Sequence, residues 1–267
     1  MLSAERITKT FRSGGGAVVA LDRVSIAVPD GMRVGLVGPS GSGKSTLARI
    51  VAMLIAPDSG SLVVDGDRID AWGLRCPRAL RHRVQLVFQA PRVSVDPRMR
   101  VGAAIVEPLA AGGLLPRASA KRAALLATWA ERVGLTEDLL DRFPHEVSEG
   151  QLQRACLARA LVVKPRYLIC DELSSMLDVS TQAALLAVIA AVQRERELGV
   201  VLITHDRVLA DAWCDDVVHI RDLTASESAW PRSVSRAIDR DAADDVFSAP
   251  WTASRSANAG TGGKTSV

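Results

Sequence analysis

The chain has 267 residues and a mass of 28.4 kDa, and 48% of its residues are hydrophobic while 24% are charged. This balance is typical of a folded protein with a sizeable core and excludes disorder throughout the chain. The formal net charge of +3 is too small for a protein that coats nucleic acid, so we expect no nucleic-acid partner.

The longest uncharged apolar run, at residues 183–192, is well short of the roughly 20 residues that a membrane-spanning helix needs. Charged residues near the N-terminus leave no hydrophobic secretion signal, so we expect a chain that stays in the cytoplasm and crosses no bilayer. The cysteines are spaced too widely for a CxxC metal knuckle or a dense disulfide framework, which predicts buried, reduced thiols. They are Cys76, Cys156, Cys170 and Cys214.

The N-terminal part of the chain reads as strands around a glycine-rich loop. Residues 17–28 alternate loosely between apolar and polar, which predicts a half-buried strand or hairpin, and a turn follows at residues 29–31. Residues 32–37 form a short apolar run that leads into the loop, after which apolar residues recur at helical spacing. The order is therefore strand, loop, helix, with a further strand predicted at residues 61–64.

Helical patterns dominate the middle of the chain, after a strand predicted at residues 84–88. We expect helices at residues 101–110, 117–133 and 150–163, forming a helical subdomain over about residues 90–155. Strands predicted at residues 167–170, 200–203 and 217–220 then alternate with helices at 182–196 and from His205 onward. This alternation predicts an α/β fold with a mostly parallel sheet covered on both faces.

The composition changes near residue 224 to Ser, Ala, Thr and Gly. We expect one domain over residues 1–223 and a C-terminal extension over residues 224–267, whose last dozen residues have almost nothing to bury and are predicted to be disordered.

The loop between the first predicted parallel strand and its helix matches the phosphate-binding pattern G-x-x-x-x-G-K-[ST]. Glycines let backbone N–H groups and the helix N-terminus face a phosphate, while Lys44 supplies a positive charge and Ser45 a Mg²⁺ ligand. The alternative is a glycine-rich turn that matches by chance, which the strand and helix around it make improbable. The predicted phosphate-binding residues are Gly38, Pro39, Ser40, Gly41, Ser42, Gly43, Lys44, Ser45 and Thr46.

An acidic pair, Asp171 and Glu172, follows the apolar strand predicted at residues 167–170. Ligands of parallel sheets bind at this carboxyl edge. Asp171 would hold Mg²⁺ through its water shell, and Glu172 would polarise the water that attacks a γ-phosphate. A solvated acidic pair that caps a helix is the alternative reading of these two residues alone.

Four further motifs follow in a characteristic order: Gln89, residues 147–151 (Val-Ser-Glu-Gly-Gln), residues 175–178 (Ser-Met-Leu-Asp) and His205. They resemble the Q-loop, signature, D-loop and H-loop of the ATP-binding subunits of ABC transporters, and the resemblance covers roughly residues 5–222. Residues 84–89, 96–99, 101–108, 143–146 and 178–182 are similar to the peptide and nickel importer ATPases. Residues 151–161 and 203–206, with Trp213 and Cys214, are similar to the nickel importer member.

The resemblance implies the ABC ATPase fold, which joins a P-loop core with a mostly parallel sheet to an N-terminal antiparallel β subdomain and an inserted helical subdomain. It implies ATP and Mg²⁺ as cofactors and a head-to-tail dimer in which each subunit's signature covers ATP on the other. Glu172, His205 and Lys44 would be catalytic, and Ser45, Gln89 and Asp171 would coordinate Mg²⁺. Phe11 would stack on adenine, and the remaining nucleotide contacts would be Ser148, Gly150, Gln151 and Asp178.

Single residues of this set have plain structural alternatives. Gln89 could be a solvated loop residue, His205 could be structural or exposed, and Phe11 could belong to the core of the opening strand. Joint occurrence with the phosphate loop favours the functional interpretation.

The function implied by the resemblance is an importer subunit at the cytoplasmic face of the cell membrane, which couples ATP-driven dimer closure to the uptake of nickel, a metal chelate or a di- or oligopeptide. Its partners would be a second ABC ATPase subunit, two transmembrane permease subunits and, indirectly, an extracytoplasmic solute-binding protein. A non-hydrolysing or weakly hydrolysing regulatory subunit of a heterodimer is one alternative. A soluble ABC ATPase acting on nucleic acid is less favoured, because the chain has no sustained heptads for the coiled coils of that class.

Two features depart from the family or stay open. Glu149 stands where the signature has its first glycine, and a carboxylate there would repel a γ-phosphate unless it points to solvent. We therefore expect the signature of this chain to cover ATP bound on the partner subunit less well than the family signature does. Seven arginines and one acid lie between residues 75 and 100, which indicates either a solvated face or a surface near the permease or anionic lipids.

Overall fold

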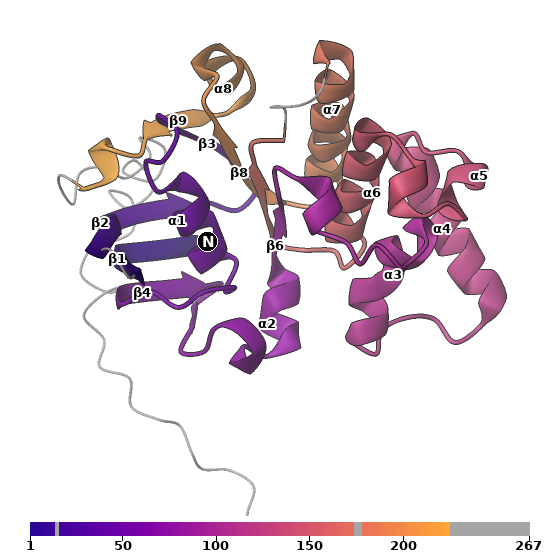
Figure 1. Cartoon of the computed structure of the whole chain (residues 1–267), viewed down its shortest axis with the longest axis horizontal. Helices are drawn as coiled ribbons and strands as arrows, with labels where there is room; N and C mark the ends of the chain where they lie inside the picture. Colours follow the sequence, from indigo (N-terminus) through magenta and orange to yellow (C-terminus); the bar gives the residue numbers. More distant parts are fainter. Residues whose placement is uncertain (14–15, 174–177, 225–267) are drawn as a thin grey trace, which may run out of the picture.

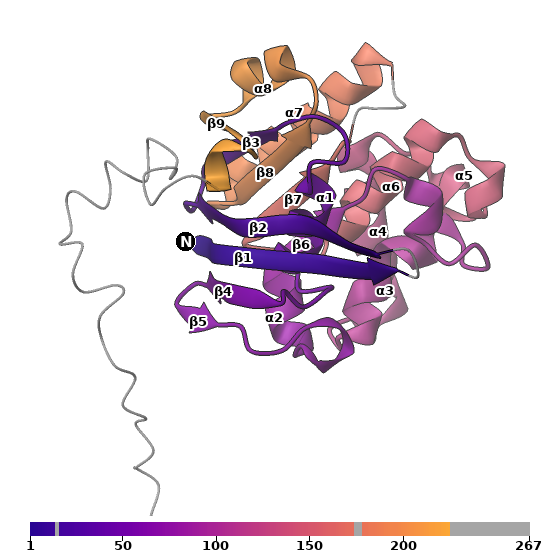
Figure 2. The same cartoon turned by 60° about the vertical axis from the view of Figure 1, so that its left-hand side comes forward.

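A small antiparallel sheet and a larger parallel sheet share one apolar core in the computed structural model, which describes residues 1–13, 16–173 and 178–224 (Figure 1). The antiparallel sheet has the order β2-β1-β4-β5, with β1 (Leu2–Ser13), β2 (Gly16–Val28), β4 (Ser59–Val64) and β5 (Asp67–Arg68). The parallel sheet has the order β6-β7-β8-β3-β9, with β3 (Arg33–Val37), β6 (Val84–Val87), β7 (Tyr167–Asp171), β8 (Gly199–Thr204) and β9 (Asp216–His219). Figure 2 shows β1 between β2 and β4.

The helices follow the strands in the alternation that the sequence predicts. They are α1 (Lys44–Val51), α2 (Arg78–Arg83), α3 (Val101–Ala111), α4 (Ser119–Val133), α5 (Glu137–Leu140), α6 (Glu149–Leu161), α7 (Val179–Glu195) and α8 (Arg207–Trp213). Helices α3 to α6 pack together on the side of the parallel sheet away from the antiparallel sheet (Figure 1). Within the described residues, no helix combines the length and the apolarity that crossing a membrane takes.

The three central strands of the parallel sheet, β7, β8 and β3, are mostly apolar, as expected where both faces of a sheet are covered. Every residue of β7 is buried. Leu168 and Cys170 face the core that contains α6 and α7, whereas Tyr167 and Ile169 face α1 and the antiparallel sheet. This period-two division confirms the predicted α/β fold with helices on one face and a second sheet with α1 on the other.

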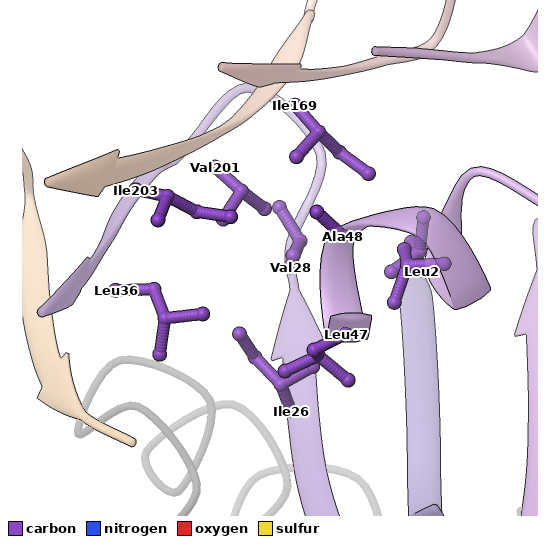
Figure 3. A pocket seen from close by; sticks show the side chains of 10 residues that line it. Leu2, Ile26, Val28, Leu36, Leu47, Ala48, Ile169, Val201 and Ile203 are labelled. Atoms are coloured by element: carbon purple, nitrogen blue, oxygen red, sulfur yellow. The ribbon is translucent and has the colours of Figure 1, made fainter. Parts of the chain in front are cut away.

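Side chains from both sheets and α1 meet in the apolar core that the two sheets share (Figure 3). They leave a cavity of about 10 Å³ between Leu36, Leu47 and Ile203 and their neighbours. Its lining is apolar, so a water molecule there would find no hydrogen-bond partners, and the cavity is a small packing defect rather than a ligand site.

Several predicted helix boundaries shift by two or three residues, among them the start of α4 (119 instead of 117) and of α7 (179 instead of 182), and the shifts in α6 and α8 have a clear local cause. Helix α6 ends at Leu161 instead of residue 163, because Lys164 has a φ of 58° and precedes a proline. Helix α8 begins at Arg207 rather than at His205, because the Asp206 carboxylate accepts a hydrogen bond from the Leu209 N–H and caps the helix there.

The thiols of the chain are free, as predicted. Cys76, Cys156 and Cys170 are buried, and Cys214 is half-buried. Burial raises the pKa of the Cys156 thiol to about 11, which keeps it protonated and unreactive at neutral pH.

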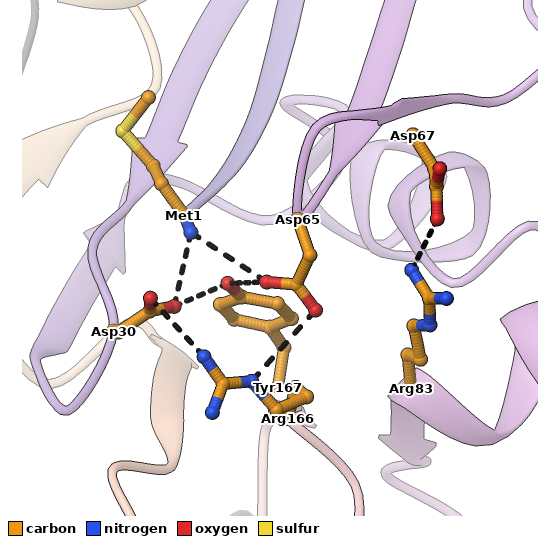
Figure 4. A network of polar contacts seen from close by, with 7 residues as sticks. All are labelled: Met1, Asp30, Asp65, Asp67, Arg83, Arg166 and Tyr167. Carbon is orange, nitrogen blue, oxygen red and sulfur yellow. Dashed lines mark hydrogen bonds and ion pairs between the residues drawn. The ribbon is translucent and has the colours of Figure 1, made fainter.

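A polar network ties the two sheets together at the end of β7 that lies away from the glycine-rich loop (Figure 4). The Tyr167 hydroxyl lies 2.7 Å from Oδ1 of Asp65 and also hydrogen-bonds Asp30. The Arg166 guanidinium lies 3.2 Å from Asp30 and 3.7 Å from Asp65. Burial and then the two carboxylates raise the pKa of Tyr167, so the hydroxyl stays protonated and able to donate.

Two parts of the predicted organisation lie outside the described residues: the C-terminal extension from residue 225 onward and the D-loop residues 175–177. The boundaries of the predicted helical subdomain stay a prediction.

Candidate functional site

The glycine-rich loop connects the end of β3 to the start of α1, as its sequence predicts. Gly41 and Gly43 have φ values of 76° and 95°, a conformation that favours glycine. A Cβ atom on Gly43 would lie 2.3 Å from the backbone oxygen of Ala20 in β2. The loop therefore closes tightly against the antiparallel sheet, with no room for a side chain at this glycine.

Lys44 is folded back into this loop. Its Nζ donates hydrogen bonds to the backbone oxygens of Gly38 and Pro39, both at 2.8 Å, and the residue is 4% exposed. Carbonyl oxygens carry only partial negative charge, so they hold the ammonium group without neutralising it. The arrangement places the Lys44 ammonium group within the loop at the start of α1, which suits an anion such as a phosphate.

Ser45, in the first turn of α1, meets Asp171, the last residue of β7. The Ser45 hydroxyl donates to Oδ1 of Asp171 at 3.1 Å. Burial raises the pKa of the Asp171 carboxyl, opposed by this hydrogen bond, and the neighbouring charge of Glu172 raises it further. A hydroxyl and a partly desolvated carboxylate this close are oxygen ligands of the kind that Mg²⁺ takes, so the residues present fit the predicted metal.

Glu172 lies at the carboxyl edge of the sheet between the ends of two neighbouring strands. Its backbone N–H donates to the oxygen of Ile203 in β8 at 3.0 Å, and its own φ is 50°. Gln89, just after β6, donates from Nε2 to Oε2 of Glu172 at 2.8 Å. Nδ1 of His205, just after β8, lies 3.9 Å from Oε1 of Glu172.

The strand order explains this convergence. Because β6, β7 and β8 are parallel neighbours, the residues that follow them reach the same edge of the sheet. The structure thus brings Gln89, Glu172 and His205 together at the edge where Ser45 meets Asp171.

The signature residues cap helix α6. The Ser148 hydroxyl accepts from the Gln151 N–H at 3.2 Å, and the Gln151 side chain accepts from the Ser148 N–H at 2.9 Å, a capping box. Ser148 is exposed and Glu149 is half-buried. Among the described residues, no hydrogen bond or ion pair joins Ser148, Gly150 or Gln151 to the phosphate loop.

Asp178 has a local role in the structure as the N-cap of α7. Its carboxylate accepts from both the N–H and the hydroxyl of Thr181, at 2.9 and 2.8 Å. Hydrogen bonds from Ser180 and then from Thr181 hold the pKa of this carboxyl well below its usual range. The sequence interpretation assigned Asp178 to the nucleotide, and the helix cap is the contact that the structure displays.

Phe11 does not belong to the core of the opening strand. It is 44% exposed on β1, and Nζ of Lys9 lies 5.7 Å from the centre of its ring. Val18 of β2 is paired opposite Phe11 and is 66% exposed, and Val19 beside it is 61% exposed. Phe11 and Val18 are cross-strand partners and share one face of the hairpin, whereas Val19 faces the other side. The same hairpin approaches Gly43 through the backbone oxygen of Ala20.

The sequence interpretation missed Val18 and Val19. The signal was present, because two successive valines interrupt the alternation of a half-buried strand and force one of them to face outward. The exposed apolar pair of Phe11 and Val18, on the hairpin beside the phosphate loop, suits the face of a nucleotide base.

Comparison with known proteins identifies the family of this chain. The sequence profile of the ABC transporter family matches residues 21–175. A putative peptide import ATP-binding protein of Brucella abortus (strain 2308) is 42% identical over 209 residues, which cover 75% of this chain and 60% of that protein. The glutathione import ATP-binding protein GsiA of Escherichia coli (strain K12) is 41% identical over 194 residues, which cover 73% of this chain and 31% of GsiA.

The chain thus spans 60% or less of the length of these two relatives. Among solved structures, the dimeric bacterial ABC transporter cassette MJ0796 superposes with a TM-score of 0.75 at 25% identity, covering 82% of this chain and 94% of that one. The family profile matches more than half of the chain, and the two relatives are more than 40% identical to it. Both findings agree with the fold. The chain belongs to the ABC transporter family.

Proposed function

We propose that this chain is the ATP-binding and ATP-hydrolysing subunit of an ABC importer. The observation that carries the proposal is the convergence at one sheet edge of Lys44 in its loop, the Ser45–Asp171 pair and Glu172 with its neighbours Gln89 and His205. A phosphate site, a metal site and a carboxylate base together are the parts that phosphoryl transfer to water needs.

The residues divide this chemistry between them. Lys44 and the loop N–H groups bind the β- and γ-phosphates. Ser45 and Asp171, with Gln89, would hold Mg²⁺, which supplies charge neutralisation at the phosphate oxygens. Glu172 orients the attacking water and accepts its proton, and His205 at the same edge contacts the γ-phosphate. Phe11, with Val18 opposite it, supports the adenine ring.

The signature residues act on a second subunit. Ser148 is exposed at the N-terminus of α6, where its hydroxyl and the helix N–H groups can reach a γ-phosphate bound by a partner. ATP therefore favours closure of a head-to-tail dimer and ADP does not, so hydrolysis reopens the dimer. Asp178, beside the helix that it caps, would lie at the same interface.

The closure drives two permease subunits at the cytoplasmic face of the membrane, fed by an extracytoplasmic solute-binding protein. The two curated relatives described above are named for peptide and for glutathione import, which favours a small peptide as the solute over nickel or a metal chelate. Within the chain, the domain that performs this work would extend over residues 1–223.

A weakly hydrolysing, regulatory member of a heterodimer is the second candidate function. One observation favours it: the half-buried carboxylate of Glu149 in the first turn of α6, beside the serine that would meet the partner's γ-phosphate. The intact set of Lys44, Asp171 and Glu172 favours hydrolysis on this chain's own side of the dimer.

The test compares Glu172→Gln with Glu131→Gln, an exposed glutamate of α4. Phosphate release from ATP is measured for the full chain, alone and mixed with the cassette subunit encoded beside it. We expect Glu172→Gln to lose about 100-fold or more in turnover with nucleotide affinity unchanged, because general bases contribute at least that much, and Glu131→Gln to behave as wild type. Persistent hydrolysis in Glu172→Gln would contradict the role of this residue.

A further inference from the structure

Most arginines between residues 75 and 100 can be read as a solvated surface, but two of them make a different kind of contact. Arg83 pairs with Asp67, and Arg98, whose side chain is 88% exposed, pairs with Asp96 two residues away. Arg92 and Arg100 instead donate to backbone oxygens of residues 141–147, the segment that leads into the signature helix α6. We call this segment the pre-signature segment.

Arg92 makes a two-pronged contact with the C-terminal half of the pre-signature segment. Its Nη1 donates to the oxygen of Pro144 at 2.9 Å, and its Nη2 donates to the oxygen of Val147 at 3.4 Å. Val147 directly precedes Ser148, the N-cap of α6. The planar guanidinium group fixes two acceptors at once, which a lysine ammonium group does not do in the same geometry.

Arg100 and its neighbour hold the other end of the pre-signature segment. The Arg100 guanidinium donates to the oxygen of Asp141 and stands 5.1 Å over the ring of Phe143. The N–H of Val101, the first residue of α3, donates to the oxygen of Arg142 at 2.9 Å. The pre-signature segment is therefore attached at both ends to the chain that follows Gln89.

Helix α6 is attached to the same stretch. Gln153, which is 2% exposed, donates from Nε2 to the oxygen of Phe88 at 3.3 Å, immediately before Gln89. Sγ of Cys156 lies 3.8 Å from the oxygen of Pro91, immediately before Arg92. Residues 88–92 thus contact α6 along its first two turns, while Arg92 contacts the segment before it.

We propose that Arg92 is a positioning residue that couples the state of the nucleotide at Gln89 to the placement of the signature helix, with Arg100 fixing the far end of the pre-signature segment. Gln89 contacts Glu172 at the place where a γ-phosphate would arrive, and Arg92 is three residues further on. A displacement of Gln89 is passed through Arg92 to Val147 and hence to Ser148. This inference rests on the proposed function, because it needs ATP to bind at the phosphate loop.

The experiment measures hydrogen–deuterium exchange in the full chain for peptides that cover residues 141–152. Each protein is saturated with Mg²⁺ and either ADP or the non-hydrolysable β,γ-imido analogue of ATP. We expect the wild type to exchange these amides at least threefold more slowly with the analogue than with ADP. In Arg92→Gln the difference should vanish, while affinity for a fluorescent ATP analogue stays within twofold of wild type. A purely structural role would change exchange equally in both nucleotide states.

Arg98→Gln is the matched control, since Arg98 contacts Asp96 alone among the described residues, and it should keep the full difference. Should Arg92→Gln fail to fold, Arg92→Lys is compared with Arg98→Lys in the same experiment. Arg92→Lys should lose at least half of the exchange difference between the two nucleotide states, and Arg98→Lys should keep it. An unchanged difference in the Arg92 variants, or no difference in the wild type, overturns the inference. Failure of the wild type to bind either nucleotide overturns the proposed function instead.

Discussion

The hydroxyl of Ser45 hydrogen-bonds Oδ1 of Asp171 at 3.1 Å, although the two residues are 126 positions apart in the chain. The contact joins the start of α1 to the end of β7, two elements that belong to different halves of the sequence. It places a hydroxyl and a carboxylate where both can ligate one cation.

The first prediction concerns the loss of the Ser45 hydroxyl. Ser45→Ala should raise the Mg²⁺ concentration needed for half-maximal ATP binding about tenfold or more, the scale of loss that ligand-shell mutations produce. Ser45→Thr keeps a hydroxyl and should stay near wild type. Titration of Mg²⁺ against binding of a fluorescent ATP analogue measures this, and an alanine variant with wild-type dependence would remove Ser45 from the metal site.

The second prediction concerns the tight approach of the loop to β2. Gly43→Ala would push a Cβ atom to 2.3 Å from the Ala20 oxygen, whereas a Cβ on Gly66 would meet no atom within 4 Å. Both glycines have positive φ, so alanine costs about 1–2 kcal/mol of backbone strain at each. Gly43→Ala should cost about 1–3 kcal/mol more, from overpacking. Equal urea midpoints for the two variants would refute this account of the loop.

The sequence predicted the parts of the site better than their assembly. The strand, loop and helix around Lys44 could be read from local patterns, because apolar periodicity and glycine chemistry are local properties. That Gln89, Glu172 and His205 share one edge follows from the order β6-β7-β8, which long-range strand pairing decides. Such pairing, like that of Arg33 with Val200, leaves no signal in a single strand.

The contacts that the sequence did not predict involve backbone atoms or side chains on separate elements. Arg92 donates to two backbone carbonyl oxygens. Because every residue carries a carbonyl oxygen, the sequence does not indicate which residues accept these hydrogen bonds. Helix α8 starts later than predicted because Asp206 caps it, and capping depends on which side chain reaches the free N–H groups.

The third prediction tests the unusual signature. Glu149→Gln removes the charge while keeping the size of the side chain, and Glu149→Gly restores the family residue. Repulsion of a γ-phosphate by a carboxylate at 4 Å is about 1 kcal/mol in water and more in a closed interface, so either variant should tighten ATP-driven association about fivefold or more. Sedimentation with ATP measures this. Association as in the wild type in both variants would show that the carboxylate points away from the phosphate.

The fourth prediction concerns acid stability. Although partial burial opposes it, hydrogen bonds from Tyr167 and the positive charges nearby lower the pKa of Asp30 below its ordinary value of 3.8. The stability that this carboxylate contributes is therefore present above about pH 4 and is lost as the pH falls further. Asp30→Asn should flatten the decline in the free energy of unfolding below pH 4.

The control is Asp22→Asn, which alters an exposed carboxylate whose side chain contacts only the adjacent Arg23 among the described residues. Urea unfolding between pH 3 and pH 7 measures both variants. If the free energy of unfolding declines as steeply with falling pH in Asp30→Asn as in the wild type, the network in Figure 4 does not contribute to the loss of stability in acid.

The most direct test of a nucleotide shared between two cassettes is the mass of the Glu172→Gln protein in solution, measured by analytical ultracentrifugation with Mg²⁺ and either ATP or ADP. The protein, alone or with the cassette subunit encoded beside it, should sediment as a dimer with ATP and as separate chains with ADP. The same mass under both nucleotides, in both preparations, would contradict the central claim.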